Sequence, residues 1–394
     1  MARSDEILLR MEHVCKLYGP NRAEAAAMMR AGADKEAVYQ ATGCTVALWD
    51  VNLAIPKGKV FVIIGLSGSG KSTAVRCFNR LTAPTEGRVL YGAQDLREMD
   101  RRDLLAYRRD KVSMVFQSFG LMSHRDVLGN AAYGLEVRGV PRAEREKQAM
   151  KYLAMVGLEG WEHQSCDQLS GGMRQRVGIA RALAGGSEVL LMDEPFSALD
   201  PLVRRDMQYE LLKIQHKLKR TIVFITHDID EAFKMGDTVC IMKDGRVVQV
   251  GTPEELTVRP ADDYVRSFVG GADRTRVVSV SNIMITPSSI VRVHDGAEQA
   301  IREMRNNGLS SVVVIDDELR LVGMLSIDEA LRARQTGQSI ADALHAELVT
   351  VAPDTRIADV IPAATEAKLP IAVVDEENVL LGLVTKAAIL AALL

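Results

Sequence analysis

The chain has 394 residues, of which 47% are hydrophobic, and a formal net charge of −3, a composition typical of a water-soluble protein with two or three domains. Its apolar runs, residues 60–66 and 379–394, are too short to cross a bilayer, and the second contains Lys386. The acidic N-terminal stretch argues against a signal peptide, and five cysteines without CxxC spacing argue against a metal or disulfide framework.

A short insertion is the first distinctive segment. Residues 20–43 are rich in Ala, Met and Glu, which favours helix, and a strand is expected near residues 48–53. We expect the insertion to form two small helices that pack on the domain rather than contact a ligand.

A phosphate-binding loop follows the next predicted strand. Residues 60–64 are a β-branched and aromatic run that leads into GLSGSGKS at residues 65–72, and a helix is predicted over residues 72–81. The loop fits GxxxxGK[ST], in which glycines let backbone N–H groups point at phosphate oxygens, Lys71 reaches the β- and γ-phosphates and Ser72 ligates Mg²⁺. The residues of this predicted site are Gly65, Ser67, Gly68, Ser69, Gly70, Lys71, Ser72 and Thr73.

A second phosphate-handling element lies about a hundred residues later, at LSGGM, residues 169–173. The Ser170 hydroxyl and the backbone of Gly171 and Gly172 stand at the start of the helix-forming run MRQRVGIARAL, and a helix N-terminus suits phosphate. One nucleotide cannot easily need both elements from a single subunit.

Two further strands are predicted to end in polar side chains. Residues 188–194 form an apolar run that ends in Asp193 and Glu194, as a buried parallel strand would deliver acids to the carboxyl edge of a sheet. Asp193 suits the Mg²⁺ shell, and Glu194 suits orienting or deprotonating the attacking water. The run 221–226 ends at His227, whose imidazole would reach the γ-phosphate.

A domain boundary is predicted near residue 272, where the small flexible stretch VGGAD occupies residues 269–273. Residues 276–394 carry ten Lys or Arg and sixteen Asp or Glu, so this part is acidic and the first part is net basic. The acidic part repeats internally: residues 312–317 match residues 370–375 at an offset of 58, and one extra residue then aligns Ser326 with Thr385. Each copy is predicted to form a helix, two strands around a turn, and a helix.

In order and spacing, the motifs of the first part resemble those of the ATP-binding-cassette (ABC) ATPases, where the phosphate loop of one subunit and the signature of a second close on the same ATP. The resemblance implies an α/β fold over residues 1–272: a P-loop NTPase cassette with a RecA-like core and a helical subdomain. It also implies a homodimer that hydrolyses ATP with Mg²⁺. The commonest signature ends in Gln where this chain has Met173, a change we expect to leave hydrolysis intact.

The resemblance assigns further roles. Gln117 matches the glutamine that senses Mg²⁺ and the attacking water, Tyr18 matches the aromatic residue on the adenine ring, and Asp200 ends the SALD loop at the dimer interface. Plain packing is the alternative for Tyr18. The implied catalytic residues are Glu194, His227, Gln117 and Lys71, and the implied Mg²⁺ ligands are Ser72, Gln117 and Asp193.

With the insertion included, residues 1 to about 270 closely resemble the ATPase subunit of glycine betaine/proline-type osmoprotectant importers. This implies separate transmembrane permease subunits, a periplasmic or extracellular substrate-binding protein, a place at the cytoplasmic face of the bacterial inner membrane, and no nucleic acid. Residues 118–135 would form a groove for the permease, with Phe119, Leu121 and Met122 exposed by loop character; an internal hydrophobic cluster is the alternative.

The repeat resembles a tandem pair of CBS domains, at about residues 276–334 and 335–394, which often bind adenine nucleotides. Where nucleotide-binding copies usually have Asp three residues after Ser or Thr, this chain has Glu329 and Ala388. A nucleotide sensor and a scaffold without ligand both remain open. The acidic unit would also respond to ionic strength, because salt screens its attraction to cationic surfaces over about 8–10 Å.

Two other functions compete with osmoprotectant import. An importer for another small solute would use the same cassette chemistry. A soluble cassette protein acting as a nucleotide-sensing switch, or on nucleic acid or ribosomes, usually has two cassettes or basic arms, whereas this chain has one cassette and an acidic tail.

Overall fold

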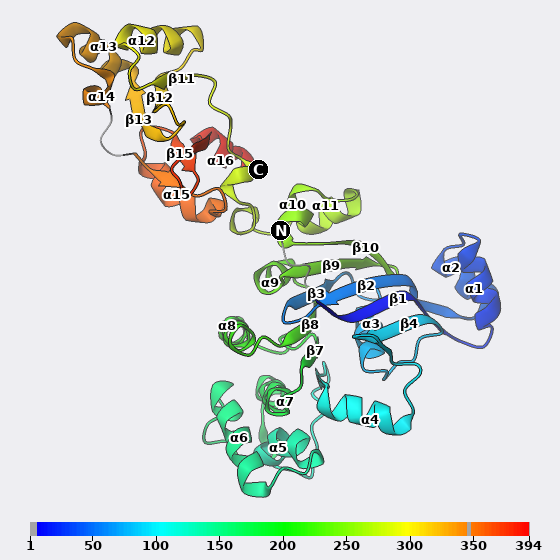
Figure 1. Ribbon diagram of the computed structural model, residues 1–394. Helices are drawn as coiled ribbons and strands as arrows, with labels where there is room; N and C mark the ends of the chain where they lie inside the picture. The colour runs from blue at the N-terminus through cyan, green and yellow to red at the C-terminus, as the bar shows by residue number, and fades with distance from the viewer. Residues whose placement is uncertain (1–5, 345–347, 394) are drawn as a thin grey trace. The chain divides into compact units, whose positions relative to one another are not determined.

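A computed structural model describes residues 6–344 and 348–393 (Figure 1). The chain forms two compact units, the first comprising Met1–Leu256 with Pro260–Gly271 and the second comprising Thr257–Arg259 with Ala272–Leu394. Residues 1–5, which open the stretch that argues against a signal peptide, lie outside the described part. Within that part, no helix has both the length and the apolar character needed to span a bilayer.

A six-stranded sheet forms the centre of the first unit, in the order β10-β9-β3-β8-β7-β6. Its strands are β3 (Val60–Ile64), β6 (Val112–Val115), β7 (Val189–Asp193), β8 (Thr221–Thr226), β9 (Thr238–Lys243) and β10 (Arg246–Gly251). All neighbours are parallel except β9 and β10. Every residue of β3, β7 and β8 is buried, which is why these strands are continuous apolar runs. The predicted strands 60–64 and 221–226 are confirmed.

A four-stranded antiparallel sheet, in the order β2-β1-β4-β5, covers one side of the central sheet. Its strands are β1 (Ile7–Tyr18), β2 (Thr45–Pro56), β4 (Glu86–Tyr91) and β5 (Gln94–Asp95). Helix α3 (Lys71–Phe78) contributes Ala74 and Phe78 to the core between the sheets, where they meet Met11 and Ile63. The phosphate loop is therefore held between two sheets.

The predicted strand 48–53 is longer than expected because β2 pairs along most of β1. The insertion between these strands forms the two predicted helices, α1 (Arg22–Arg30) and α2 (Lys35–Thr42), which lie together beside the ends of β1 and β2 (Figure 1). Their small core joins Ala26, Met29 and Val38 to Leu17 and Val46 of the strands.

The remaining helices of the first unit include a separate helical cluster, made by α5, α6 and α7 (Figure 1). The helices after α3 are α4 (Arg101–Asp110), α5 (Val127–Val137), α6 (Arg142–Met155), α7 (Gly171–Ala184), α8 (Pro201–Leu218), α9 (Ile229–Met235), α10 (Pro253–Val258) and α11 (Asp263–Val269), with a 3₁₀ turn at Cys166–Gln168. This arrangement, a nucleotide-type sheet with an attached helical cluster, agrees with the predicted fold class.

The second unit contains two three-stranded sheets of the same pattern, β11-β12-β13 and β14-β15-β16. The first copy has β11 (Ile290–Arg292), α12 (Ala297–Asn306), β12 (Ser311–Ile315), β13 (Leu321–Ser326), α13 (Ile327–Thr336) and α14 (Ile340–Ala343). The second has β14 (Thr350–Val351), α15 (Ile357–Glu366), β15 (Ile371–Val374), β16 (Leu380–Val384) and α16 (Lys386–Leu393), and 3₁₀ turns lie at Arg274–Arg276 and Val280–Asn282. The predicted order of helix, two strands and helix is confirmed.

The alignment of residues 312–317 with residues 370–375 was wrong by one residue. Asp316 and Asp375 occupy the same place, because each carboxylate accepts hydrogen bonds from the backbone N–H groups two and four residues later. The offset there is 59 and not 58, the same offset that aligns Ser326 with Thr385, whereas α12 and α15 begin and end at an offset of 60. The two turns also join the copies: the Leu321 N–H donates to the Asn378 carbonyl at 2.9 Å and the Leu380 N–H to the Leu319 carbonyl at 3.1 Å.

Candidate functional site

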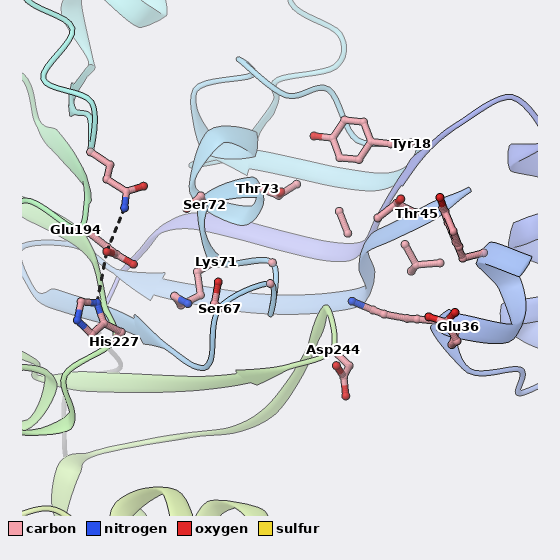
Figure 2. A pocket seen from close by; sticks show the side chains of 17 residues that line it. Tyr18, Glu36, Thr45, Ser67, Lys71, Ser72, Thr73, Glu194, His227 and Asp244 are labelled. Atoms are coloured by element: carbon pink, nitrogen blue, oxygen red, sulfur yellow. Dashed lines mark hydrogen bonds and ion pairs between the residues drawn. The ribbon is translucent and has the colours of Figure 1, made fainter. Parts of the chain in front are cut away.

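The carboxyl ends of β3, β7 and β8 bring three predicted motifs to one edge of the central sheet. Ile64 pairs with Thr226, and Asp193 pairs with Ile225, so the phosphate loop, the paired acids and His227 start from neighbouring positions. A cavity of about 810 Å³ opens at this edge (Figure 2). Ten of the predicted site residues line it: Tyr18, Ser67, Gly68, Gly70, Lys71, Ser72, Thr73, Gln117, Glu194 and His227.

The phosphate loop needs its glycines. A Cβ on Gly65 would lie 2.2 Å from the Met242 carbonyl oxygen, and a Cβ on Gly70 would lie 2.5 Å from the Ala47 carbonyl oxygen. Gly70 also has a φ of 99°, in the left-handed region that favours glycine. The loop is thus packed closely against β2 and β9, so side chains at Gly65 and Gly70 would clash with the backbone of these strands.

Lys71 is buried at the first position of α3. Its Nζ donates to the Gly65 carbonyl at 2.7 Å and the Leu66 carbonyl at 3.0 Å, so the ammonium lies inside the curl of the loop. Burial lowers its pKa, while the charges of Glu194 and Asp193 act in the opposite direction. A cation held among carbonyl oxygens is suited to exchange them for phosphate oxygens.

Ser72 and Asp193 form an oxygen pair beside the loop. The Ser72 hydroxyl donates to Asp193 Oδ1 at 2.8 Å, and Asp193 Oδ2 receives a hydrogen bond from Arg76 Nη2 at 3.2 Å. Asp193 is fully buried at the end of β7. A hydroxyl and a carboxylate in contact are the kind of donors that Mg²⁺ accepts, so these residues fit that ion.

Glu194 lies at the other end of the cavity from Tyr18, between Gln117 and His227 (Figure 2). Gln117 Nε2 donates to Glu194 Oε2 at 3.3 Å, and His227 Nδ1 lies 3.4 Å from the same oxygen. Both partners therefore hold the carboxylate in one orientation, facing the cavity.

Tyr18 stands at the end of β1 and is 43% exposed. Lys16 Nζ lies 4.8 Å from the centre of its ring, so that ammonium covers one face. Lys16 does not line the cavity, whereas Tyr18 does, which leaves the other face of the ring for the cavity.

The signature residues lie outside this lining. Ser170 is exposed at the N-cap of α7, where its hydroxyl accepts a hydrogen bond from the Met173 N–H at 3.3 Å, and Gly171 and Gly172 follow in the first turn. Asp200 caps α8 through the Val203 N–H at 3.1 Å. The structure thus does not bring Ser170, Gly171, Gly172 or Asp200 to the phosphate loop of their own chain. Gly65, Ser69 and Asp193 are buried and are not part of the lining.

The prediction that Phe119, Leu121 and Met122 are exposed was wrong, because all three are partly buried. Arg181 holds the loop by donating to the Phe119 and Gly120 carbonyls at 3.1 and 2.6 Å. A second cavity, of about 410 Å³, nevertheless lies along this segment, and Met122 is part of its lining.

Seven lining residues of the first cavity were missed by sequence reasoning, and three of them, Lys35, Glu36 and Tyr39, belong to α2; the others are Thr45, Val46, Ala47 and Asp244. The place of the insertion in the sequence could have indicated this contact. The insertion starts directly after Tyr18 and returns at Thr45, and these two residues pair across β1 and β2, so the insertion begins and ends beside the predicted adenine contact.

Comparison with known proteins agrees with these features. The family model described as "ABC transporter" matches residues 48–197, and the one described as "CBS domain" matches residues 280–336 and 340–394. A dimeric bacterial ABC transporter cassette, MJ0796, superposes with a TM-score of 0.55 at 32% identity, covering 62% of this chain and 99% of the other. A structure of the same cassette bound to ADP and Pi, described as a post-hydrolysis state, gives a TM-score of 0.54.

Relatives align over nearly the whole chain. A glycine betaine transport ATP-binding protein of Bacillus subtilis, OpuAA, is 44% identical over 98% of this chain and 92% of its own length. The glycine betaine/proline betaine transport ATP-binding protein ProV of Escherichia coli is 43% identical over 98% of both chains. The predicted family and fold class are confirmed: this chain, which carries tandem CBS domains, belongs to the ATP-binding proteins of ABC transporters, in the group that includes these glycine betaine transport subunits.

Proposed function

We propose that the chain hydrolyses ATP at a site completed by a second copy, and so powers uptake of glycine betaine, proline or a related quaternary amine through a separate permease. The observation that carries this proposal is the first cavity, in which the phosphate loop faces Gln117, Glu194 and His227 while Ser170 of the same chain lies outside the lining. A helix N-terminus that is exposed and suited to phosphate is then available to a partner's nucleotide.

Each residue at the cavity has a separate task in this scheme. The Lys71 ammonium exchanges loop carbonyls for β- and γ-phosphate oxygens. Ser72, Asp193 and Gln117 would hold Mg²⁺, which would neutralise phosphate charge. The Glu194 carboxylate orients and deprotonates the attacking water, and His227 lies at the γ-phosphate end. Tyr18 offers its open ring face to the adenine.

The transport partners are inferred from the relatives and from one surface. Relatives that align over 98% of this chain are named for glycine betaine transport. Relatives named for trimethylamine N-oxide, for choline, or for glycine betaine, carnitine and choline together align over 80–87%. The second cavity, with Phe116, Met122 and Val137 in its lining, supports a permease docking groove next to the Gln117 loop. The working location is then the cytoplasmic face of the membrane, beside the permease and an external substrate-binding protein.

The CBS pair is assigned to regulation, and scaffolding is the alternative. Ser326 and Glu329 form a capping box at α13, with the Ser326 hydroxyl donating to Glu329 Oε2 at 2.6 Å, so both side chains have a structural partner. Thr385 caps α16 by accepting a hydrogen bond from the Ala388 N–H at 3.1 Å. Because these are the positions of the expected ribose contact, ionic strength is favoured over an adenine nucleotide as the signal.

The decisive test replaces Glu194 by Gln, which keeps the shape of the side chain and removes its charge. With permease and binding protein reconstituted in vesicles, Glu194→Gln should bind ATP, accumulate as an ATP-bound dimer in size-exclusion chromatography, and lose about 100-fold or more of its turnover and uptake. Glu144→Gln, an exposed change on α6, is the control that keeps wild-type rates. Wild-type hydrolysis by Glu194→Gln would overturn the catalytic assignment. If vesicles with the wild-type protein took up a different solute and no quaternary amine, the substrate assignment would be overturned and the catalytic assignment would stand.

A further inference from the structure

The helix α2 of the insertion forms one end of the first cavity. Lys35, Glu36 and Tyr39 line it together with Tyr18 and Thr45. Figure 2 shows Glu36, Thr45 and Tyr18 on the side of the phosphate loop opposite Glu194 and His227. A nucleotide whose γ-phosphate points to the catalytic end would therefore extend its adenosine toward α2.

The position of α2 is fixed by packing. Val38 is fully buried against Leu17, Cys44 and Val46, and Asp34 caps the helix by accepting a hydrogen bond from the Ala37 N–H at 2.7 Å. Lys35 and Tyr39 flank Val38 on the helix surface, and both line the cavity. Lys35 and Tyr39 are four residues apart, so they lie on one side of the helix and border the same end of the cavity.

Lys35 brings a positive charge to the loop from the adenosine side. A Cβ on Gly245 would lie 3.0 Å from Lys35 Nζ, and the Gly245 N–H donates to the Ser69 carbonyl of the phosphate loop at 3.0 Å. Burial lowers the pKa of Lys35, whereas the charge of Asp244 acts in the opposite direction. Within residues 6–344 and 348–393, Lys35 makes no hydrogen bond or ion pair. Its ammonium is available to an incoming phosphate oxygen.

Tyr39 supplies a second aromatic ring on the same wall. Tyr39 is 50% exposed and lines the cavity together with Tyr18, whose ring is covered by Lys16 on one face. Aromatic side chains in a nucleotide pocket bind a base by stacking, which any purine satisfies.

We propose that α2 is a nucleotide-binding element in which Tyr39 contacts the adenine beside Tyr18 and Lys35 binds the α-phosphate. This rests on the proposed ATP site. It assigns to the insertion a role in substrate binding, where composition alone predicted packing. The contact is made by the same subunit that supplies the phosphate loop, so it acts on ATP affinity before any dimer closes.

The test separates adenosine contacts from phosphate contacts. The full chain is titrated in a calorimeter with ATP and with inorganic tripolyphosphate, both in EDTA so that no hydrolysis occurs. Tyr39→Ala should raise the Kd for ATP roughly five-fold or more and leave the Kd for tripolyphosphate unchanged, and Tyr39→Phe should restore ATP binding. Lys35→Met should raise both values on the order of tenfold.

Glu24→Gln, on the exposed surface of α1, is the matched control and should change neither Kd. Unfolding midpoints like that of the wild type would show that the variants fold. If Tyr39→Ala does not fold, Tyr39→Leu is used in its place. Unchanged ATP binding in both the Tyr39 and Lys35 variants, with binding lost in Lys71→Ala, would overturn the role of α2 and leave the ATP site standing. Unchanged binding in Lys71→Ala would overturn the proposed site itself.

Discussion

Glu194 has a φ of 48°, in the left-handed region where side chains other than that of glycine are strained. Its N–H donates to the Ile225 carbonyl at 3.2 Å, which ties the residue to the neighbouring strand, and its carboxylate is held by Gln117 and His227. Strain of this kind persists where the surroundings fix it, and a carboxylate that must orient one water benefits from a fixed position. The sequence predicts the acid but not this backbone conformation, because strand β8 imposes it.

Glu231 is a second unusual carboxylate, buried on α9 shortly after His227. It accepts a hydrogen bond from Gln208 Nε2 at 2.7 Å. Burial raises its pKa above the ordinary 4.5, and hydrogen bonds from Thr226 and Gln208 oppose that shift. In the folded state the protonated form is therefore favoured relative to the unfolded state.

This shift predicts how stability depends on pH. As pH rises from 4.5 through the raised pKa, the unfolded chain releases this proton first, so the contribution of Glu231 to folding stability is lost. Glu231→Gln should remove that loss, and the free energy of unfolding of the variant minus that of the wild type should increase over the same range. Urea unfolding followed by tryptophan fluorescence measures it, since Trp49 and Trp161, the chain's two tryptophans, belong to the first unit.

The control for this series is Glu24→Gln, which removes a carboxylate from the exposed surface of α1. Its difference from the wild type should stay flat over the same pH range. A flat difference for Glu231→Gln as well would contradict the assignment of a raised pKa to Glu231.

At the scale of elements, the central strands could be predicted best. Strands β3 and β8 match the expected residues because a parallel strand buried on both faces needs a continuous apolar run, which is visible without tertiary information. The ends of those strands also place Lys71, Glu194 and His227 together, since parallel strands share a carboxyl edge.

Elements whose role depends on contacts with distant parts of the chain could not be predicted in this way. The composition of α2 favours helix, but its contact with the cavity follows from the pairing of Tyr18 with Thr45, which is tertiary. Phe119 was predicted to be exposed, but Arg181 holds its carbonyl and Arg174 lies 5.9 Å from its ring. Two arginines from α7 therefore decide the burial of a loop some sixty residues away.

For the whole molecule, the separation of Ser170 from the cavity lining predicts action between subunits. A Ser170→Arg subunit retains an intact phosphate loop, and a Lys71→Ala subunit retains an intact signature. Mixing the two inactive proteins should therefore restore one composite site in each heterodimer, and random exchange should yield roughly a quarter of wild-type ATPase activity. The measurement is phosphate release by the equimolar mixture after exchange.

The control carries both changes, Ser170→Arg and Lys71→Ala, in one subunit and is mixed with wild-type protein. That heterodimer has no intact composite site, so only wild-type homodimers should contribute activity. A mixture of the two single variants that stays as inactive as each homodimer would refute sharing of the site between copies.

The two units carry opposite net charge, which leads to a prediction about regulation. Residues 276–394 have sixteen acidic and ten basic side chains, while the whole chain has a net charge of −3, so the first part is net basic. Salt screens attraction between such an acidic unit and cationic surfaces within about 8–10 Å at physiological strength. We place the boundary near residue 272 and expect the acidic unit to make transport depend on internal salt.

Truncation after Gly271 tests this directly, because the proposed hydrolytic residues all precede residue 228 and both tryptophans remain. The truncated protein should bind ATP with the wild-type Kd, and in vesicles with the permease its uptake should vary little with internal potassium chloride, since the charge that salt screens is gone. A matched full-length variant keeps the fold and removes charge alone: Glu376→Gln with Glu377→Gln, both exposed in the turn before β16, should weaken the salt response in part. A salt response of unchanged steepness after truncation would assign the CBS pair to assembly instead, and loss of ATP binding would mean that the boundary cuts into the cassette.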